Sequence, residues 1–201
     1  MANKSATPAY SSSLLHALQF AGHIHAEQRR KGGDVPYLSH LMAVCALVLD
    51  YGGSETEAIG ALLHDAAEDC GGKEMLAKVR NTFGEEVAGI VEGCTDTFED
   101  PKPDWRPRKE AYVAHLKEAN DSVRIVACAD KLHNLLCTVR DLRQTPGAEY
   151  WNRFSAGRDS QLWYYEACLD AFSTGNEPPM LPEYRIVFKE FGILCKVGRI
   201  L

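Results

Sequence analysis

Apolar residues recur at intervals of three and four along most of the chain, which is the spacing of amphipathic helices. Leu14, Leu18 and Ala21 make one such face within residues 13–27. The same pattern predicts further helices at about 41–49, 55–69, 73–83, 85–93, 108–119, 122–142 and 159–172. No run of residues alternates between apolar and polar as a half-buried strand does. The fold is therefore predicted to be all-α, a single-domain helical bundle.

Capping residues, glycines and prolines mark where these helices begin and end. Ser54 and Glu57 form a capping box that opens the helix at 55–69. Three prolines and the lack of any period make 96–107 a surface loop. The predicted organisation is a flexible leader at 1–12, a helical domain at 13–176, and a linker with a short helix packing on the domain at 177–201.

The composition is that of an ordinary globular protein, since 45% of the 201 residues are hydrophobic and 25% are charged. No apolar run approaches the roughly 20 residues that cross a bilayer, so no membrane partner is expected. The net charge of −6 argues against a protein that coats nucleic acid, because phosphates are neutralised by Lys and Arg. The seven cysteines are odd in number and form no C-x-x-C pair, which predicts free thiols in a reducing cytoplasm.

Four ionisable side chains crowd the apolar stretch 62–69, namely His64, Asp65, Glu68 and Asp69. In a continuous helix His64 and Glu68 share one face, and Asp65 and Asp69 share another. Packing such groups against leucines costs desolvation energy unless a cation or a partner charge compensates. A lone His-Asp pair is usually a surface feature, but this density favours a divalent metal site. Imidazole with carboxylate suits manganese, iron or zinc.

Two more potential ligands stand at helix positions flanked by core residues. His40 follows Tyr37 by three residues, and Asp130 lies within the apolar helix at 122–142. With His64 and Asp65 they complete a candidate set of four metal ligands, and this set is the ligand pattern of the HD superfamily.

Longer motifs carry a resemblance to one family. They are R-K-G at 30–32, Y-x-x-H at 37–40, H-D-x-x-E-D at 64–69 and A-D-K-L-H-N at 129–134. Over residues 21–142 the chain resembles the hydrolase domain of the RelA/SpoT homologues, and especially the stand-alone small alarmone hydrolases. The resemblance implies an HD-type helical bundle that removes the 3′-pyrophosphate from alarmone nucleotides of the (p)ppGpp or (p)ppApp type.

The resemblance also implies roles for individual residues around the metal. One metal ion, by analogy Mn²⁺, would be held by His40, His64, Asp65 and Asp130. Glu68 and Asp69 would form the acidic pair beside it. One of the two would deprotonate the attacking water and the other would protonate the leaving oxygen, and the sequence leaves their order open.

The expected partner is a small-molecule nucleotide, and the resemblance implies residues that bind it. Arg30 and Lys31 would contact its phosphates, and Asn134 would touch the nucleoside. Within the aromatic run 163–165, Tyr164 is the candidate for stacking on the base. No oligomeric state is predicted.

Departures from the family pattern bear on the nucleotide and not on the metal. Ala127 stands where the family often has a lysine, and Leu136 and Cys137 replace an Arg and a Thr of some long members. Guanosine and adenosine alarmones are therefore both open as substrates. Two other functions are also open, namely an HD phosphohydrolase that removes, for example, the 2′-phosphate of NADPH, and a non-catalytic alarmone-binding or antitoxin-type module. A pure binder has no need of Glu68 and Asp69, which favours the enzyme.

Overall fold

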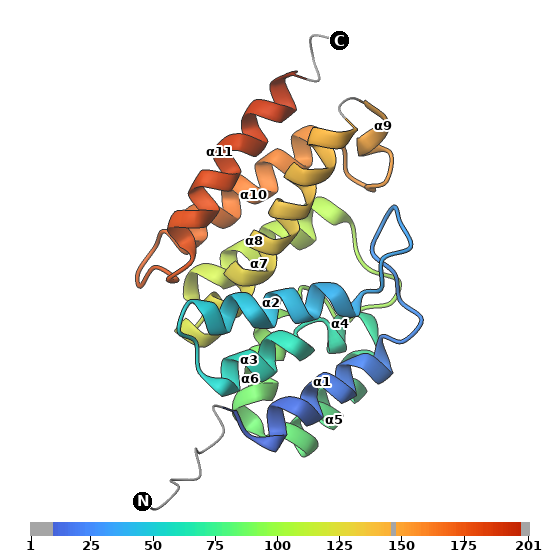
Figure 1. Cartoon of the computed structure of the whole chain (residues 1–201), viewed down its shortest axis with the longest axis vertical. Helices are drawn as coiled ribbons and strands as arrows, with labels where there is room; N and C mark the ends of the chain where they lie inside the picture. Colours follow the sequence, from blue (N-terminus) through green and yellow to red (C-terminus); the bar gives the residue numbers. More distant parts are fainter. Residues whose placement is uncertain (1–9, 146–147, 198–201) are drawn as a thin grey trace, which may run out of the picture.

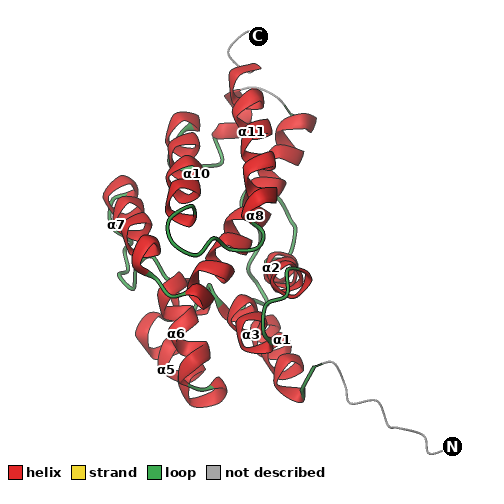
Figure 2. Cartoon of the chain, turned by 90° about the vertical axis from the view of Figure 1, so that its left-hand side faces the viewer, coloured by secondary structure: helices red, strands yellow, loops and turns green. Residues whose placement is uncertain are grey.

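The computed structural model describes residues 10–145 and 148–197, and Figure 2 shows only helices and loops among them. The all-α prediction is confirmed, since the described residues form no strand beyond an isolated bridge between Arg29 and Pro36. Among the described helices, none is both long and apolar enough to cross a membrane. The helices are α1 (Ser12–Ile24), α2 (Leu38–Asp50), α3 (Glu55–Leu63), α4 (Ala66–Asp69), α5 (Gly72–Phe83), α6 (Glu85–Cys94), α7 (Trp105–Glu118), α8 (Asp121–Gln144), α9 (Ala148–Trp151), α10 (Arg158–Phe172) and α11 (Leu181–Val197).

The 24-residue helix α8 is the central element of the fold. It contacts α2, α3 and α6, which lie in the lower half of Figure 1, and α10 and α11, which lie in the upper half. Helix α7 packs on α10, α1 packs on α3, and α5 packs on α6. Side chains on the inward faces of α8 are therefore held by helices from both halves of the molecule.

The last helix, α11, is an integral part of this core. Tyr184 and Phe191 are fully buried, and the Tyr184 hydroxyl donates to the backbone carbonyl of Tyr165 at 2.9 Å. Burying one large apolar side chain stabilises a fold by about 1.5–3 kcal/mol. The helix expected to be short therefore runs for 17 residues, because its apolar face packs on α8 and α10. The outer parts of the predicted leader and tail, 1–9 and 198–201, lie outside the described residues.

The capping box at the start of α3 forms as the sequence predicts. Ser54 Oγ accepts from the N–H of Glu57 at 3.2 Å, and the N–H of Ser54 donates to Glu57 Oε2 at 2.7 Å. The other Glu57 oxygen accepts from Ser122 Oγ at 2.8 Å, so the capping box also ties α3 to the start of α8. Ser11 caps α1 and donates to Glu55 with both its N–H and its hydroxyl, which anchors α1 to α3.

The continuous helix predicted over 55–69 is wrong at its functional end. Helix α3 stops at Leu63, His64 and Asp65 form a turn, and α4 begins at Ala66. Asp65 has φ −95° and ψ 0°, a sparsely populated conformation typical of turns and of active-site residues. The helix faces predicted from spacing therefore do not apply. Contacts of the two turn side chains with α2 and α8 outweigh the local preference for helix.

Candidate metal centre and acidic pair

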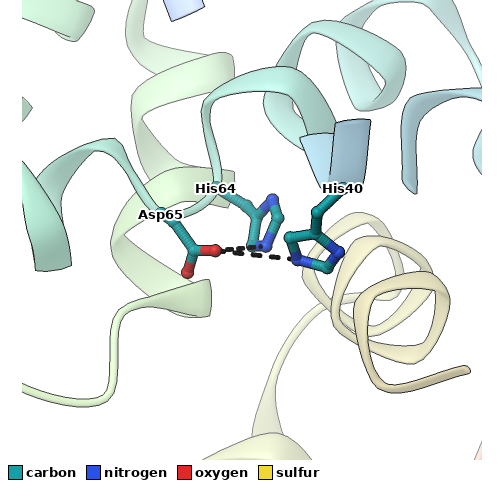
Figure 3. Close-up of side chains that lie close together, drawn as sticks. All are labelled: His40, His64 and Asp65. Atoms are coloured by element: carbon teal, nitrogen blue, oxygen red, sulfur yellow. Dashed lines mark ion pairs between the residues drawn. The ribbon is translucent and has the colours of Figure 1, made fainter. Parts of the chain in front are cut away.

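Three side chains from separate parts of the chain converge next to α8. His40 comes from α2, and His64 and Asp65 come from the turn between α3 and α4. Figure 3 shows both imidazole rings directed at the Asp65 carboxylate. Asp65 Oδ2 lies 2.9 Å from His64 Nε2 and 3.8 Å from His40 Nε2. One ligand atom from each residue lies within 4.8 Å of the others, which is compatible with a single bound metal ion.

Asp130 on α8 faces the same two rings. Its Oδ1 lies 3.1 Å from His40 Nε2 and 3.6 Å from His64 Nε2. Both Nε2 atoms are buried, and among the described residues neither finds a hydrogen-bond partner. Ring nitrogens and carboxylate oxygens that meet in a buried site are stabilised by ion pairing or by a coordinated metal ion, either of which offsets their desolvation. The four predicted ligands thus come together, and their donor atoms fit a divalent metal.

The electrostatics of this His/Asp cluster also favour bound positive charge. Burial alone lowers the pKa of an imidazole, yet Asp65 and Asp130 raise the pKa of His64 well above its usual value. Burial likewise opposes the ionisation of Asp65, but the His64 ring lowers the pKa of that carboxyl far below its usual range. For Asp130, burial is outweighed by Lys131 and the two rings, and its pKa falls as well. Burial lowers the pKa of His40, which keeps that ring neutral and able to bind a metal.

Outer contacts orient both carboxylates. The Tyr37 hydroxyl donates to Asp65 Oδ2 at 2.6 Å. Lys131 Nζ donates to Asp130 Oδ2 at 2.6 Å, and Asn134 Nδ2 donates to Asp130 Oδ1 at 2.6 Å. Tyr37 and Lys131 are not among the predicted site residues, although both stand inside the motifs of the sequence. The resemblance implies roles only for neighbouring residues of these motifs, so the sequence alone does not single out Tyr37 or Lys131.

The outer nitrogen of each imidazole is also engaged. His64 Nδ1 lies 2.8 Å from the carbonyl oxygen of Ala61, and His40 Nδ1 lies 2.7 Å from His133 Nδ1. Burial lowers the pKa of His133 to about 4, so this ring is neutral near pH 7. With both Nδ1 atoms engaged on the outside, both Nε2 atoms are left to face the carboxylates.

Glu68 and Asp69 follow the His/Asp cluster on the single turn of α4. Lys102 Nζ bridges them, at 2.8 Å from Glu68 Oε1 and 3.1 Å from Asp69 Oδ1. Gln28 Nε2 donates to Asp69 Oδ2 at 2.8 Å, and the backbone N–H of Asp96 donates to Glu68 Oε2 at 3.3 Å. The acidic pair is therefore held by the segment after α1 and by the loop between α6 and α7.

Glu68 has a strongly charged neighbourhood. Burial, followed by the carboxylates of Asp96 and Asp65, raises the pKa of Glu68. Asp96 is itself nearly buried and pairs with Arg108 and Lys109. A carboxyl group with a raised pKa keeps its proton to higher pH, which suits a group that donates a proton.

The loop between α6 and α7 contributes more than the sequence predicts. Its prolines correctly indicate a loop, but Lys102 reaches back to the acidic pair. A lysine between two prolines in a polar segment belongs to no period and no motif. The tertiary fold alone brings it to the site.

Arg30 and Asn134, which the resemblance implies as substrate contacts, lie beside the His/Asp cluster. Arg30 Nη2 donates to Asn134 Oδ1 at 2.7 Å, which links the loop after α1 to α8. Lys31 is exposed in the adjoining turn, and within the described part of the chain its ammonium group forms no hydrogen bond or ion pair. Arg30 is thus positioned by the protein, while Lys31 is free to meet a ligand.

Tyr164 lies in the interior and not on an open surface. The residue is 6% exposed, and the ammonium groups of Lys109 and Lys131 lie 5.0 and 5.8 Å from the ring centre. A ring that stacks on a base needs a free face. The structure therefore does not support the stacking role predicted for Tyr164.

Comparisons with known proteins agree with the geometry of the His/Asp cluster. A family model described as HD domain matches residues 17–153. The guanosine-3′,5′-bis(diphosphate) 3′-pyrophosphohydrolase MESH1 of Xenopus tropicalis is 35% identical over 143 residues, covering 69% of this chain and 74% of that protein. The Homo sapiens protein of the same name is 36% identical over 147 residues, covering 71% and 75%. A probable guanosine-3′,5′-bis(diphosphate) 3′-pyrophosphohydrolase of Synechocystis is 35% identical over 130 residues, but the chain spans only 16% of its length.

Two solved structures extend the likeness to the fold. A metazoan ortholog of SpoT that hydrolyses ppGpp superposes with a TM-score of 0.76 at 26% identity, covering 93% of this chain and 99% of that one. A Listeria monocytogenes protein superposes with a TM-score of 0.66 at 31% identity, covering 75% and 96%. The shared fold therefore extends over most of the chain.

Proposed function

The chain belongs to the HD domain family, and from this premise we propose that it is a metal-dependent hydrolase that removes the 3′-pyrophosphate from alarmone nucleotides of the (p)ppGpp or (p)ppApp type. One observation carries the proposal. The buried His/Asp cluster lies beside the acidic pair, Arg30 donates a hydrogen bond to Asn134 next to the cluster, and Lys102 donates to the acidic pair. The named activity of the relatives gives this arrangement its substrate class.

We assign the metal to four residues of the cluster. The ligands are His40, His64, Asp65 and Asp130, and the mixed imidazole and carboxylate set suits Mn²⁺. When bound, such an ion lowers the pKa of a water molecule and polarises a phosphoryl oxygen. The unpartnered Nε2 atoms of the two histidines support this assignment.

The acidic pair moves the protons of the reaction. Asp69 orients and deprotonates the attacking water, and Glu68 protonates the leaving oxygen. The raised pKa of Glu68 supports this order, because the group that donates must hold a proton near neutral pH. Lys102 keeps the two carboxylates side by side and partly offsets their mutual repulsion.

Cationic and amide groups bind the nucleotide. Arg30 and Lys31 contact its phosphates, and Asn134 touches the nucleoside, in each case by charge-assisted or polar hydrogen bonds. Binding of a small anion is compatible with the net charge of −6, because the cations needed are local. No disulfide joins any of the seven cysteines, all of which lie within the described residues, and we place the protein in a reducing cytoplasm.

The first experiment follows what is released from a panel of nucleotides. Purified protein with Mn²⁺ is incubated with 3′-pyrophosphorylated guanosine and adenosine nucleotides, NADPH and plain triphosphates, and pyrophosphate and phosphate are measured separately. We expect pyrophosphate from an alarmone and none with the Asp65→Ala variant. Phosphate from NADPH alone would move the assignment to cofactor dephosphorylation. Tight alarmone binding without any turnover would overturn the enzyme and leave a binding module.

A further inference from the structure

The two imidazoles of the His/Asp cluster are oriented in different ways. His64 Nδ1 faces the carbonyl oxygen of Ala61 at 2.8 Å, and a carbonyl oxygen only accepts hydrogen bonds. His64 therefore keeps a proton on Nδ1, so that Nε2 is the nitrogen that would offer its lone pair to a bound metal. The backbone of α3 alone determines this tautomer.

Among the described residues, the outer nitrogen of His40 has no such backbone partner. Its Nδ1 lies 2.7 Å from His133 Nδ1, and the two rings are 4.9 Å apart between centroids with an interplanar angle of 33°. An imidazole nitrogen donates or accepts according to the tautomer of its ring. His40 can direct a lone pair from Nε2 at a metal only if His133 Nδ1 accepts. The tautomer of His133 therefore decides the state of His40.

Cys137 stands one helical turn beyond His133 on α8. Its Sγ lies 3.6 Å from His133 Nε2, within the longer range of hydrogen bonds to sulfur. When the sulfur accepts from Nε2–H, the proton of His133 is held on Nε2 and its Nδ1 is free to accept from His40. In this arrangement His40 Nδ1–H donates to His133 Nδ1, and His133 Nε2–H donates to Cys137 Sγ. The lone pair of His40 Nε2 is then available to a metal.

We propose that His133 is a positioning residue for the metal ligand His40, and that Cys137 selects the tautomer of His133 that makes this possible. The inference rests on the proposed function, because it takes His40 as a metal ligand. Outer partners of metal-binding histidines typically change metal affinity about 10–100-fold when they are removed. Helix α8 then contributes to the metal site through its own ligand Asp130 and through the support that it gives to His40.

Substitutions at position 133 separate this role from simple space filling. In His133→Asn the side-chain oxygen occupies the place of Nδ1 and can still accept from His40. In His133→Gln the polar end instead reaches the place of Nε2, and in His133→Leu no acceptor remains. We expect Mn²⁺ affinity, measured by competition with a chelator, to fall about 10–100-fold in His133→Leu and His133→Gln. His133→Asn should stay within about threefold of the wild type, since it keeps the acceptor at the position that matters.

Controls make the outcomes distinguishable. His115→Leu removes an imidazole whose one hydrogen-bond contact among the described residues is the backbone carbonyl of Gly93, and it should leave Mn²⁺ affinity unchanged. If the wild type does not bind Mn²⁺, or if His64→Ala binds it as tightly as the wild type, the proposed function and this inference are both overturned. If His64→Ala abolishes binding but His133→Leu and His133→Gln bind Mn²⁺ as tightly as the wild type, only the inference is overturned.

The contribution of Cys137 is tested in the same assay. Cys137→Ser keeps a hydrogen-bond acceptor near His133 Nε2 and should retain the affinity, whereas Cys137→Ala removes it. We expect Cys137→Ala to weaken Mn²⁺ binding by a smaller factor than His133→Leu, about threefold to tenfold, because water can replace the sulfur at this partly exposed position. Equal affinities for Cys137→Ala and the wild type would exclude the tautomer role of the thiol.

Discussion

The His/Asp cluster and the acidic pair lie side by side but are built in different ways. The cluster residues come from α2, α8 and the turn after α3, and their side chains are between 0% and 17% exposed. The acidic pair stands on a single helical turn and is held by Lys102, whose side chain is 40% exposed. The positions of the cluster side chains are thus fixed by packing of several helices, whereas a few contacts near solvent fix the positions of Glu68 and Asp69.

Removal of a cluster ligand should have the largest effect. Asp65→Ala deletes the carboxylate that both rings face, so we expect loss of Mn²⁺ binding and pyrophosphate release below detection. Asp50→Ala, which removes an exposed carboxylate at the end of α2, is the matched control and should be fully active. Circular dichroism checks that both variants are folded. Alarmone turnover by a folded Asp65→Ala protein would contradict the metal assignment.

Glu68→Gln should separate the two regions. The amide keeps the shape of the side chain but cannot donate or take up the proton, so kcat should fall about 10²–10⁴-fold. Because Glu68 is outside the predicted ligand set, the Mn²⁺ dissociation constant should stay within about threefold of the wild type. Both quantities are measured on the same preparation. A parallel loss of metal binding and turnover would mean that the two regions act as one.

Arg30→Ala should act on substrate binding more than on the chemical step. A charge-assisted hydrogen bond contributes about 1.5–3 kcal/mol, so we expect KM to rise about 10–100-fold with a smaller change in kcat. The neighbouring Arg29→Ala is a close control, because within the part of the chain that the structure describes the Arg29 guanidinium donates only to the backbone carbonyls of Ala26 and Gln28. Equal KM values for the two variants would exclude Arg30 as a substrate-binding residue.

Lys102→Met should have the smallest effect. The ion pairs of Lys102 are partly exposed, and such pairs are worth little in water, so kcat/KM should change by less than about tenfold. The pH profile is more informative. Lys102 lowers the pKa of Glu68, so its loss raises that pKa further. If Glu68 is the proton donor, the alkaline limb of activity moves to higher pH. A shift of the acidic limb instead would make Glu68 the base.

Local pattern accounts for most of the fold. Spacing of apolar residues predicted nearly all the long helices, and the capping box at Ser54 and Glu57 formed as expected. Two errors share one cause. The turn at His64 and Asp65 and the length of α11 both depend on contacts with α8, which is remote in sequence from each. Local propensity is a weak preference that tertiary packing readily overrides.

Within the site, the sequence by itself determined the chemistry: which side chains can bind a metal, move a proton or meet a phosphate. The motifs around His40, His64 and Asp130 were sufficient for that, because ligand chemistry depends on residue type. Only the tertiary structure decided which groups meet. It brought Lys102 to the acidic pair and His133 to His40, and it buried Tyr164. The reason is physical: these contacts join residues distant in sequence, and their geometry exists only once the helices have packed around α8.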